Sequence, residues 1–249
     1  MSTEKFQWRC GVPGELVSSS EVHVWRVFMD TTNFQSESLL ETLSADELTR
    51  AEKFHFERDQ QRFIMARGIL RVILGHYLGK KPSELCFEYA SHGKPVLANN
   101  DGCAALSFNL SHSGEIILYA ITRSRKIGID VERIRDNVDV GQIAHRFFSA
   151  GEIGSLDKIH KKNRSEVFFQ YWARKEAFIK ATGEGVSFPM EQCDVSLIGG
   201  SVLSPIILPG DNSESSHWYG QDLFPGHGYA AAIAVEGGDL DLSCRDYAV

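Results

Sequence analysis

Two long helical tracts, each followed by a cysteine-containing strand, most constrain how this chain can fold. We predict helices over about 60–78 and 163–182, with the strands CFEYA and CDVSLI after them. The tracts FIMARGILRVILG and QYWARKEAFIKATG overlay on a shared Ala-Arg, which matches Arg67 with Arg174. A duplicated strand–helix unit is one interpretation. An overlay this short also arises by chance, so the residues alone leave the duplication open.

The remaining elements follow from local signals. A capping box at Ser44 and Glu47 predicts the start of a helix. A hairpin is expected between LSFNL and EIILYAIT, with its turn at 111–114. Further strands are predicted at VHVWRVFMD, at KIGIDVERI and at GYAAAIAV, and an exposed loop in the second half of 199–216.

Composition narrows the class of protein. The 249 residues are 43% hydrophobic and 24% charged, which is typical of a soluble protein of one large or two small domains. A net charge of −7 gives no general attraction to nucleic acid or anionic membranes. Residues 1–15 lack the apolar core of a secretory signal, so we expect none. The sequence also has no apolar run of the roughly 18 residues that span a membrane and no CxxC pair among its five cysteines. We expect a cytoplasmic protein with reduced thiols.

Two carboxylates are predicted to share one face of a strand. In KIGIDVERI, strand alternation places Gly128, Asp130 and Glu132 opposite the isoleucines and valine. Adjacent carboxylates repel each other, and a hard cation with oxygen ligands relieves the repulsion. A solvated strand face is the competing interpretation.

A third carboxylate interrupts an apolar helix stripe. Helical spacing aligns Glu176 with Phe169, Trp172 and Ile179, and a buried acid needs a partner, a metal or a raised pKa. In the overlay, Ile69 takes its place in the first half. An ion pair of Glu176 with Lys180 or Arg174 remains the alternative. Oxygen ligands without a His/Cys cluster favour Mg²⁺, or Mn²⁺, over zinc.

Polar and basic residues near these acids suit a phosphate. Ser111, His112 and Ser113 offer hydrogen-bond donors, although an isolated turn histidine is usually just exposed. Lys175 adjoins Glu176 and is expected to neutralise a phosphate held on the same metal. A serine hydrolase is disfavoured because adjacent residues rarely reach nucleophile–base geometry and no GxSxG elbow occurs. Walker, GxGxxG and HExxH motifs are also missing from the sequence.

Together these motifs resemble the surfactin-type (Sfp-type) 4'-phosphopantetheinyl transferases. The resemblance covers roughly 93–185 and rests on ordered segments: Gly93-Lys94-Pro95, NLSHSG, IGIDVE, RFFS with Glu152, and WARKEAFIK. It implies an α+β fold, a pseudo-two-fold pair of similar α/β subdomains with the active site in the cleft between them. We accordingly expect an N-terminal subdomain over 1–125 and a C-terminal subdomain over 126–249 that carries the metal-binding acids.

The resemblance also implies residue roles. Magnesium would be bound by Asp130, Glu132 and Glu176, and the 3'-phosphate of coenzyme A by Ser111 and His112. Further contacts to the coenzyme or the reacting groups are expected from the following residues: Lys94, Arg62, Lys175, Lys180 and Glu152. The segment 46–53 departs from the family pattern, so contacts to the adenine end are left open there.

The implied reaction transfers 4'-phosphopantetheine from coenzyme A to a serine of an apo carrier protein, with 3',5'-ADP as the leaving group. Glu176, a metal-bound water or Glu152 would take the serine proton. A monomer is implied as well. Two alternatives stay open: a metal-dependent phosphohydrolase or nuclease that uses the same acids, and a non-catalytic module that binds coenzyme A or a carrier domain.

Overall fold

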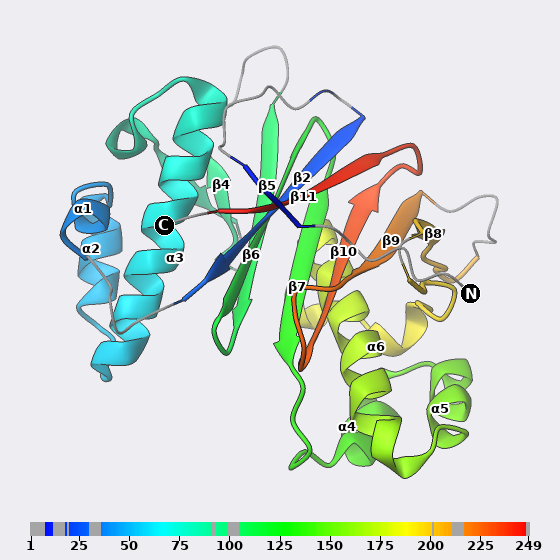
Figure 1. Cartoon of the computed structure of the whole chain (residues 1–249). Coiled ribbons are helices and arrows are strands. Elements are labelled where there is room, and N and C mark those ends of the chain that lie inside the picture. Colours follow the sequence, from blue (N-terminus) through cyan, green and yellow to red (C-terminus); the bar gives the residue numbers. More distant parts are fainter. Residues whose placement is uncertain are drawn as a thin grey trace.

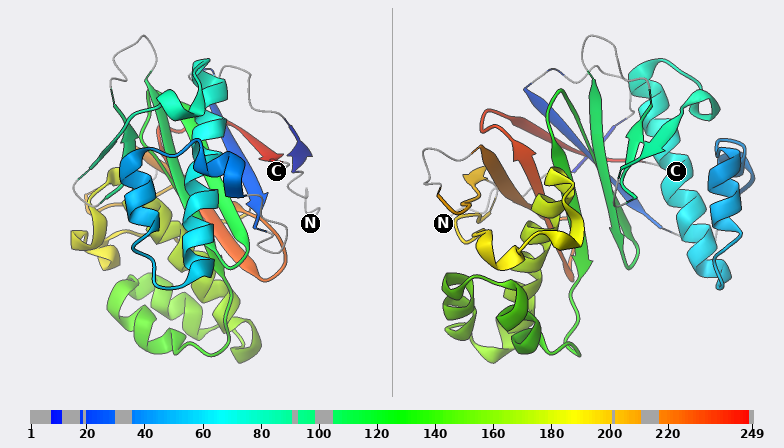
Figure 2. Two further views of the ribbon diagram at one scale, coloured as in Figure 1. Left: turned by 90° about the vertical axis from the view of Figure 1, so that its left-hand side faces the viewer. Right: turned by 180° about the vertical axis from the view of Figure 1, so that it is seen from behind.

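Two β-sheets pack face to face, and one 22-residue helix covers the outer face of each (Figure 1). The computed structural model describes residues 8–11, 18, 20–29, 36–90, 93–98, 105–200, 202–210 and 217–247. Seen from behind in Figure 2, the two helices lie at opposite sides of the paired sheets. The described chain therefore has four layers, in the order helix, sheet, sheet, helix.

The first half supplies one long helix and most of one sheet. In the described residues this sheet has the order β1-β11-β2-β6-β5, with β2 antiparallel to β6 and β6 antiparallel to β5. The elements up to the middle of the chain are β1 (Arg9–Cys10), β2 (Glu21–Phe28), α1 (Ser36–Leu40), α2 (Ala45–Ala51), α3 (Glu57–Leu78), η1 (Pro82–Glu84), β3 (Phe87–Tyr89), β4 (Pro95–Leu97), β5 (Leu106–Ser113) and β6 (Ile116–Arg123).

The second half supplies the other long helix and the sheet of order β7-β10-β9-β8. Its elements are β7 (Ile127–Arg133), α4 (Val140–Phe147), α5 (Ala150–Asp157), α6 (Lys161–Thr182), η2 (Gly185–Ser187), η3 (Met190–Gln192), β8 (Ser204–Pro205), β9 (Trp218–Leu223), β10 (Tyr229–Glu236) and β11 (Asp241–Asp246). None of the helices in the described segments combines the length and apolarity that crossing a bilayer requires.

Three apolar cores join the four layers. One lies between α3 and the first sheet, one between α6 and the second sheet, and the third between the two sheets. The middle core contains Ile127, Ile129 and Val131, so the predicted alternation of β7 is confirmed. Their neighbours on the strand consequently face α6.

Several predicted elements are confirmed and others are wrong. The two long helices form, and Gly183 ends α6 in the left-handed conformation. CDVSLI makes only an isolated bridge from Asp194 to Ile207, because it follows directly on η3 and a turn at 196–197 interrupts it. The strand β5 runs on through Ser113, so 111–113 is strand and the hairpin turns at Gly114. Part of the loop expected in 199–216 falls outside the described residues.

The final strand crosses between the halves. The boundary expected at 125/126 falls between β6 and β7, but β11 lies parallel to β2 and beside β1 in the first sheet. β11 was not predicted, although DLDLSCRD alternates polar residues with Leu240, Leu242 and Cys244, and no local signal names its partner strand. The first sheet therefore contains strands from both ends of the described chain, whereas the second sheet is built from strands of the second half alone.

Matching buried ion pairs identify equivalent positions in the two halves. Arg71 on α3 contacts Glu47 and donates to the carbonyls of Pro82, which begins η1, and Leu85, which follows it. On α6, Lys175 makes the same set of contacts, with Glu152 and with the carbonyls of Met190, which begins η3, and Cys193, which follows it.

These contacts correct the predicted overlay. They match Arg71 with Lys175, rather than Arg67 with Arg174, so Val72 takes the place of Glu176 instead of Ile69. Short helical overlays are ambiguous because a shift of three or four residues preserves the helix face. The conclusion that one half alone carries this carboxylate is unchanged.

Candidate active site

Close packing of α6 on β7 builds the candidate site. Gly128 faces the helix, and a Cβ built there would overlap the carbonyl oxygen of Ala177 and the amide nitrogen of Ala181. On the adjacent strand, alanines Ala230, Ala232 and Ala234 line the same face. Small residues allow a helix to approach a sheet closely, which brings the polar side chains of α6 to those of β7.

Asp130 is the most buried carboxylate of the site. Its Oδ1 accepts hydrogen bonds from Lys180 Nζ (2.6 Å) and Ser111 Oγ (2.9 Å). Its Oδ2 is buried and has no hydrogen-bond partner in the described part of the chain. An orphaned buried carboxylate oxygen is costly, so this atom is the one best placed for a cationic ligand.

The other two predicted acids lie within electrostatic reach of Asp130. Burial, and then the charge of Asp130, raises the pKa of Glu132 and of Glu176. Glu132 accepts a hydrogen bond from Ser113 Oγ at 3.2 Å. The carboxylate of Glu176 has no polar partner among the described residues, because Lys180 pairs with Asp130 and Arg174 with Asp222. The ion-pair alternative for Glu176 is therefore wrong.

The three acids fit a divalent cation by chemistry rather than as a ready-made cage. Among the residues that the structure describes, no three His, Cys, Asp or Glu side chains converge as a metal cluster. The orphaned oxygen, the raised pKa values of two carboxyl groups and an all-oxygen donor set nevertheless suit Mg²⁺ or Mn²⁺.

Without a metal, Glu176 should cost stability. The fold raises the pKa of the Glu176 carboxyl group, so folding favours its protonated form. The stability that this group contributes is therefore present below its ordinary pKa and is lost as the pH rises through the raised pKa. We expect Glu176→Gln to raise the melting temperature at pH 7.5 in a chelator by a few degrees, about the shift of 1 kcal/mol in a chain of this size. The difference should vanish near pH 4. A lower melting temperature for the variant at pH 7.5 would contradict this reasoning.

Ser111 and His112 point to opposite faces of β5, since they are neighbours in a strand. Ser111 belongs to the carboxylate side, where its hydroxyl also lies 3.0 Å from Lys180 Nζ. His112 lines a cavity of about 330 Å³ next to α3. The two side chains therefore leave the strand in opposite directions, and their joint binding of one phosphate stays a prediction.

The cavity beside His112 is cationic and aromatic. Its walls include Arg62, whose Nε is buried without a hydrogen-bond partner, together with Arg50 and Tyr89. Partial burial, followed by the charges of Lys180 and Arg62, lowers the pKa of His112, so the free imidazole is neutral at pH 7. The walls suit a ligand that combines an anion with a flat ring.

Lys94 ties the first half to both elements of the carboxylate site. Its ammonium group donates to the carbonyls of Lys180 (2.6 Å) and Ile127 (3.1 Å). Burial, and then the charges of Lys180 and Lys126, lowers the pKa of Lys94 to about 8. A bound anion would favour its charged form.

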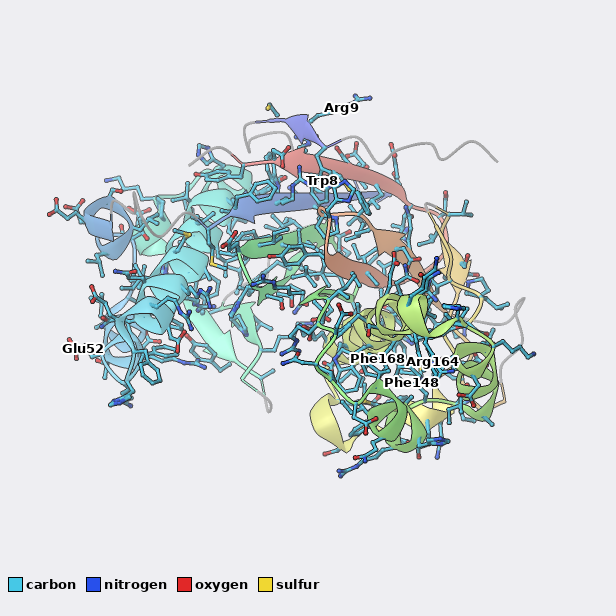
Figure 3. All side chains as sticks on the ribbon, turned by 60° about the horizontal axis from the view of Figure 1, so that its bottom comes forward. Trp8, Arg9, Glu52, Phe148, Arg164 and Phe168 are labelled. Carbon is cyan, nitrogen blue, oxygen red and sulfur yellow. The ribbon has the colours of Figure 1, made fainter. Side chains whose placement is uncertain are left out.

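Lys175 and Glu152 do not join this site, contrary to prediction. Both side chains have no exposed surface and pair with each other at 2.8 Å. Lys175 lies over the ring of Phe148, which stacks on Phe168 of α6; Figure 3 labels these two phenylalanines next to each other. Consecutive residues on a helix point about 100° apart, so Lys175 points toward α5 and η3 while Glu176 points toward the carboxylates of β7. Neither buried group can contact a phosphate or an incoming serine.

Sequence reasoning also missed residues. Gly128 was read only as part of the strand face, and Arg50 was left in an uncertain register, although it lines the cavity. Asn109 was quoted in a motif without a role, yet its Oδ1 accepts from the amide of Ile129. The polar alternation of NLSHS opposite the alternation of IGIDVE was the available signal.

Comparisons with known proteins find matches over both halves of the chain. A family model described as the 4'-phosphopantetheinyl transferase superfamily matches residues 126–234, and a model of the 4'-phosphopantetheinyl transferase N-terminal region matches 30–124. The 4'-phosphopantetheinyl transferase HetI of Nostoc sp. is 39% identical over 230 residues, which cover 92% of this chain and 94% of the relative. The transferase Sfp of Bacillus subtilis is 27% identical over 226 residues, 90% of this chain and 97% of Sfp.

Two further matches cover less of the chain. A putative 4'-phosphopantetheinyl transferase of Synechocystis sp. is 32% identical over 176 residues, 71% of this chain and 70% of the relative. The solved holo-[acyl-carrier-protein] synthase of Thermotoga maritima covers 45% of this chain and 62% of its own, with 22% identity and a TM-score of 0.35. That structural likeness is too weak to add to the sequence relationships.

Proposed function

This chain belongs to the 4'-phosphopantetheinyl transferase superfamily, and on that premise we propose that it transfers 4'-phosphopantetheine from coenzyme A to a serine hydroxyl of apo carrier proteins. 3',5'-ADP is the second product. The observation that carries the proposal is the buried, unpaired Oδ2 of Asp130 beside Glu132 and Glu176, next to a cationic cavity. Such a site suits a polyphosphate ligand and a divalent metal.

Different parts of the coenzyme would bind at the carboxylates and in the cavity beside His112. Asp130, Glu132 and Glu176 would hold the metal, which supplies positive charge to the diphosphate. His112 and Arg62 would bind the 3'-phosphate from the opposite face of β5. Lys94 would approach the coenzyme where the two halves meet.

Lys180 is suited to the departing phosphate. Its ammonium group lies between Ser111 Oγ and Asp130 Oδ1 and remains partly exposed, so it would turn toward a negative charge that grows on the leaving group. Glu152 is too buried to accept the serine proton. Glu176, with its raised pKa and half-buried carboxylate, or a water molecule beside it, would take that proton.

Mass measurement of an apo carrier protein tests the proposed reaction. After incubation with coenzyme A and Mg²⁺, we expect the carrier to gain one phosphopantetheine on a serine. Asp130→Asn should lower the rate by at least about 100-fold, because the buried carboxylate would lose its charge beside Lys180. Asp136→Asn, at an exposed loop position after β7, is the matched control and should retain activity.

The same experiment addresses the two alternatives. Phosphate or nucleotide release without any change in carrier mass would favour the phosphohydrolase. Binding of coenzyme A or carrier with no chemical change, across a panel of diverse carriers, would favour the non-catalytic module. Either result would refute the proposed transfer.

Arg62 should discriminate coenzyme A from its analogue that lacks the 3'-phosphate. We expect Arg62→Ala to weaken coenzyme A binding about tenfold, since one charge-assisted hydrogen bond contributes roughly 1.5–3 kcal/mol. Binding of the 3'-dephospho analogue, measured by the same titration, should be nearly unchanged. Arg58→Ala, on an exposed turn of the same helix, is the control. Equal losses for both ligands would place the 3'-phosphate elsewhere.

A further inference from the structure

A row of side-chain hydrogen bonds from Asn109, Ser111 and Ser113, called the seam below, joins the two halves of the chain. In the described residues no backbone ladder pairs β5 with β7. The edge strands β5 and β7 belong to different sheets, yet they run side by side. On β7, the amides of Ile129, Val131 and Arg133 each donate to a side chain twenty residues earlier in the sequence. Their acceptors are Asn109 Oδ1 (2.9 Å), Ser111 Oγ (3.4 Å) and Ser113 Oγ (3.0 Å).

The pattern follows from strand geometry. Alternate residues of β5 turn the same way, so Asn109, Ser111 and Ser113 all face β7 while Leu110 and His112 face the other side. Alternate amides of β7 likewise point at β5, because its other edge is paired with β10. Buried amides need acceptors, and the polar side chains of β5 provide them.

Both serines make a second, equivalent bond. Each hydroxyl accepts from an amide of β7 and donates its proton to the carboxylate of the preceding residue. Ser111 donates to Asp130 Oδ1 at 2.9 Å, and Ser113 donates to Glu132 Oε2 at 3.2 Å. Because a hydroxyl has one proton, the amide bond fixes which way that proton points.

We propose that Asn109, Ser111 and Ser113 fix the register between the two halves, and that Ser113 is a positioning residue that orients Glu132 for metal binding. This inference rests on the proposed metal site and extends it to residues that would not touch the metal. The hydroxyl of Ser113 holds one oxygen of Glu132 and leaves the other free for a cation. Partners of this kind orient metal ligands and strengthen their binding.

Titration of the full-length protein with Mn²⁺ by calorimetry, at one fixed pH and without coenzyme or carrier, tests the proposal. We expect Ser113→Ala to weaken Mn²⁺ binding by about 10- to 100-fold, the range for loss of such a partner. Ser113→Thr keeps the hydroxyl at a half-exposed position and should restore most of the affinity. Ser107→Ala, on the same face of β5 but without a bond to β7, should bind like the parent.

A second comparison separates positioning from general loosening. Asn109→Ala removes the seam bond that contacts no carboxylate, so it should lower the melting temperature by a few degrees and leave Mn²⁺ affinity within about threefold. Equal losses of affinity in Asn109→Ala and Ser113→Ala would overturn the assignment. So would parent-like binding by Ser113→Ala, or failure of Ser113→Thr to restore it. A parent protein that binds no Mn²⁺ would instead refute the metal site itself.

Discussion

Replacing Gly128 by alanine should remove nearly all activity and destabilise the fold. A Cβ at this position would overlap backbone atoms of Ala177 and Ala181 in α6, and backbone cannot rotate away as a flexible side chain can. We expect a loss of about 3 kcal/mol in the free energy of unfolding, at the upper end for an overpacked site. Urea denaturation measures it.

The effect on activity should exceed the effect on folding. α6 carries Glu176 and Lys180, so a displaced helix moves both side chains away from Asp130. A shift of about 1 Å in such groups lowers rates by roughly 100-fold. Gly154→Ala is the control, because its Cβ would meet nothing within 4 Å and alanine favours a helix. Parent-like activity in Gly128→Ala would show that α6 need not approach β7 so closely.

Removing the charge of Lys175 should destabilise the protein without affecting coenzyme recognition. Lys175→Met leaves Glu152 as an unpaired charge in a fully buried setting, which costs about 3–5 kcal/mol. Because Lys175 is fully buried and does not line the cavity beside His112, the variant should bind coenzyme A like the parent at a temperature where it is folded. Urea denaturation and calorimetric titration measure the two quantities.

Two companion variants make this result specific. The double change Lys175→Met with Glu152→Leu removes both charges and should recover most of the lost stability. Lys162→Met, at an exposed position of the same helix, should change stability by less than about 0.5 kcal/mol. If the Lys175→Met protein were fully stable but bound coenzyme A more weakly, the buried structural role would be refuted. The phosphate contact expected of Lys175 from the sequence would then be favoured.

Strand periodicity was sufficient to predict which residues of β7 share a face. Alternation along β7 separated Ile127, Ile129 and Val131 from Asp130 and Glu132, and the structure confirms that division. Alternation succeeds because neighbouring strand residues always face opposite ways.

The rotation of α6 about its axis and the strand order of the first sheet could not be predicted from the sequence. Lys175 adjoins Glu176 in the chain, yet the two face different surroundings, and only the packing of α5 and η3 decides which one is buried. The same limit applies to β11, whose place beside β2 depends on a contact more than 200 residues away. Local patterns carry no information on such distant partners.

Crystals grown with Mn²⁺ and coenzyme A, and measured at the manganese absorption edge, test the central claim most directly. We predict an anomalous peak about 2.1 Å from Asp130 Oδ2, with oxygens of Glu132 and Glu176 and of the coenzyme diphosphate around it. Coenzyme bound with its diphosphate away from these carboxylates, and Asp130 still paired with Lys180 alone, would contradict the account.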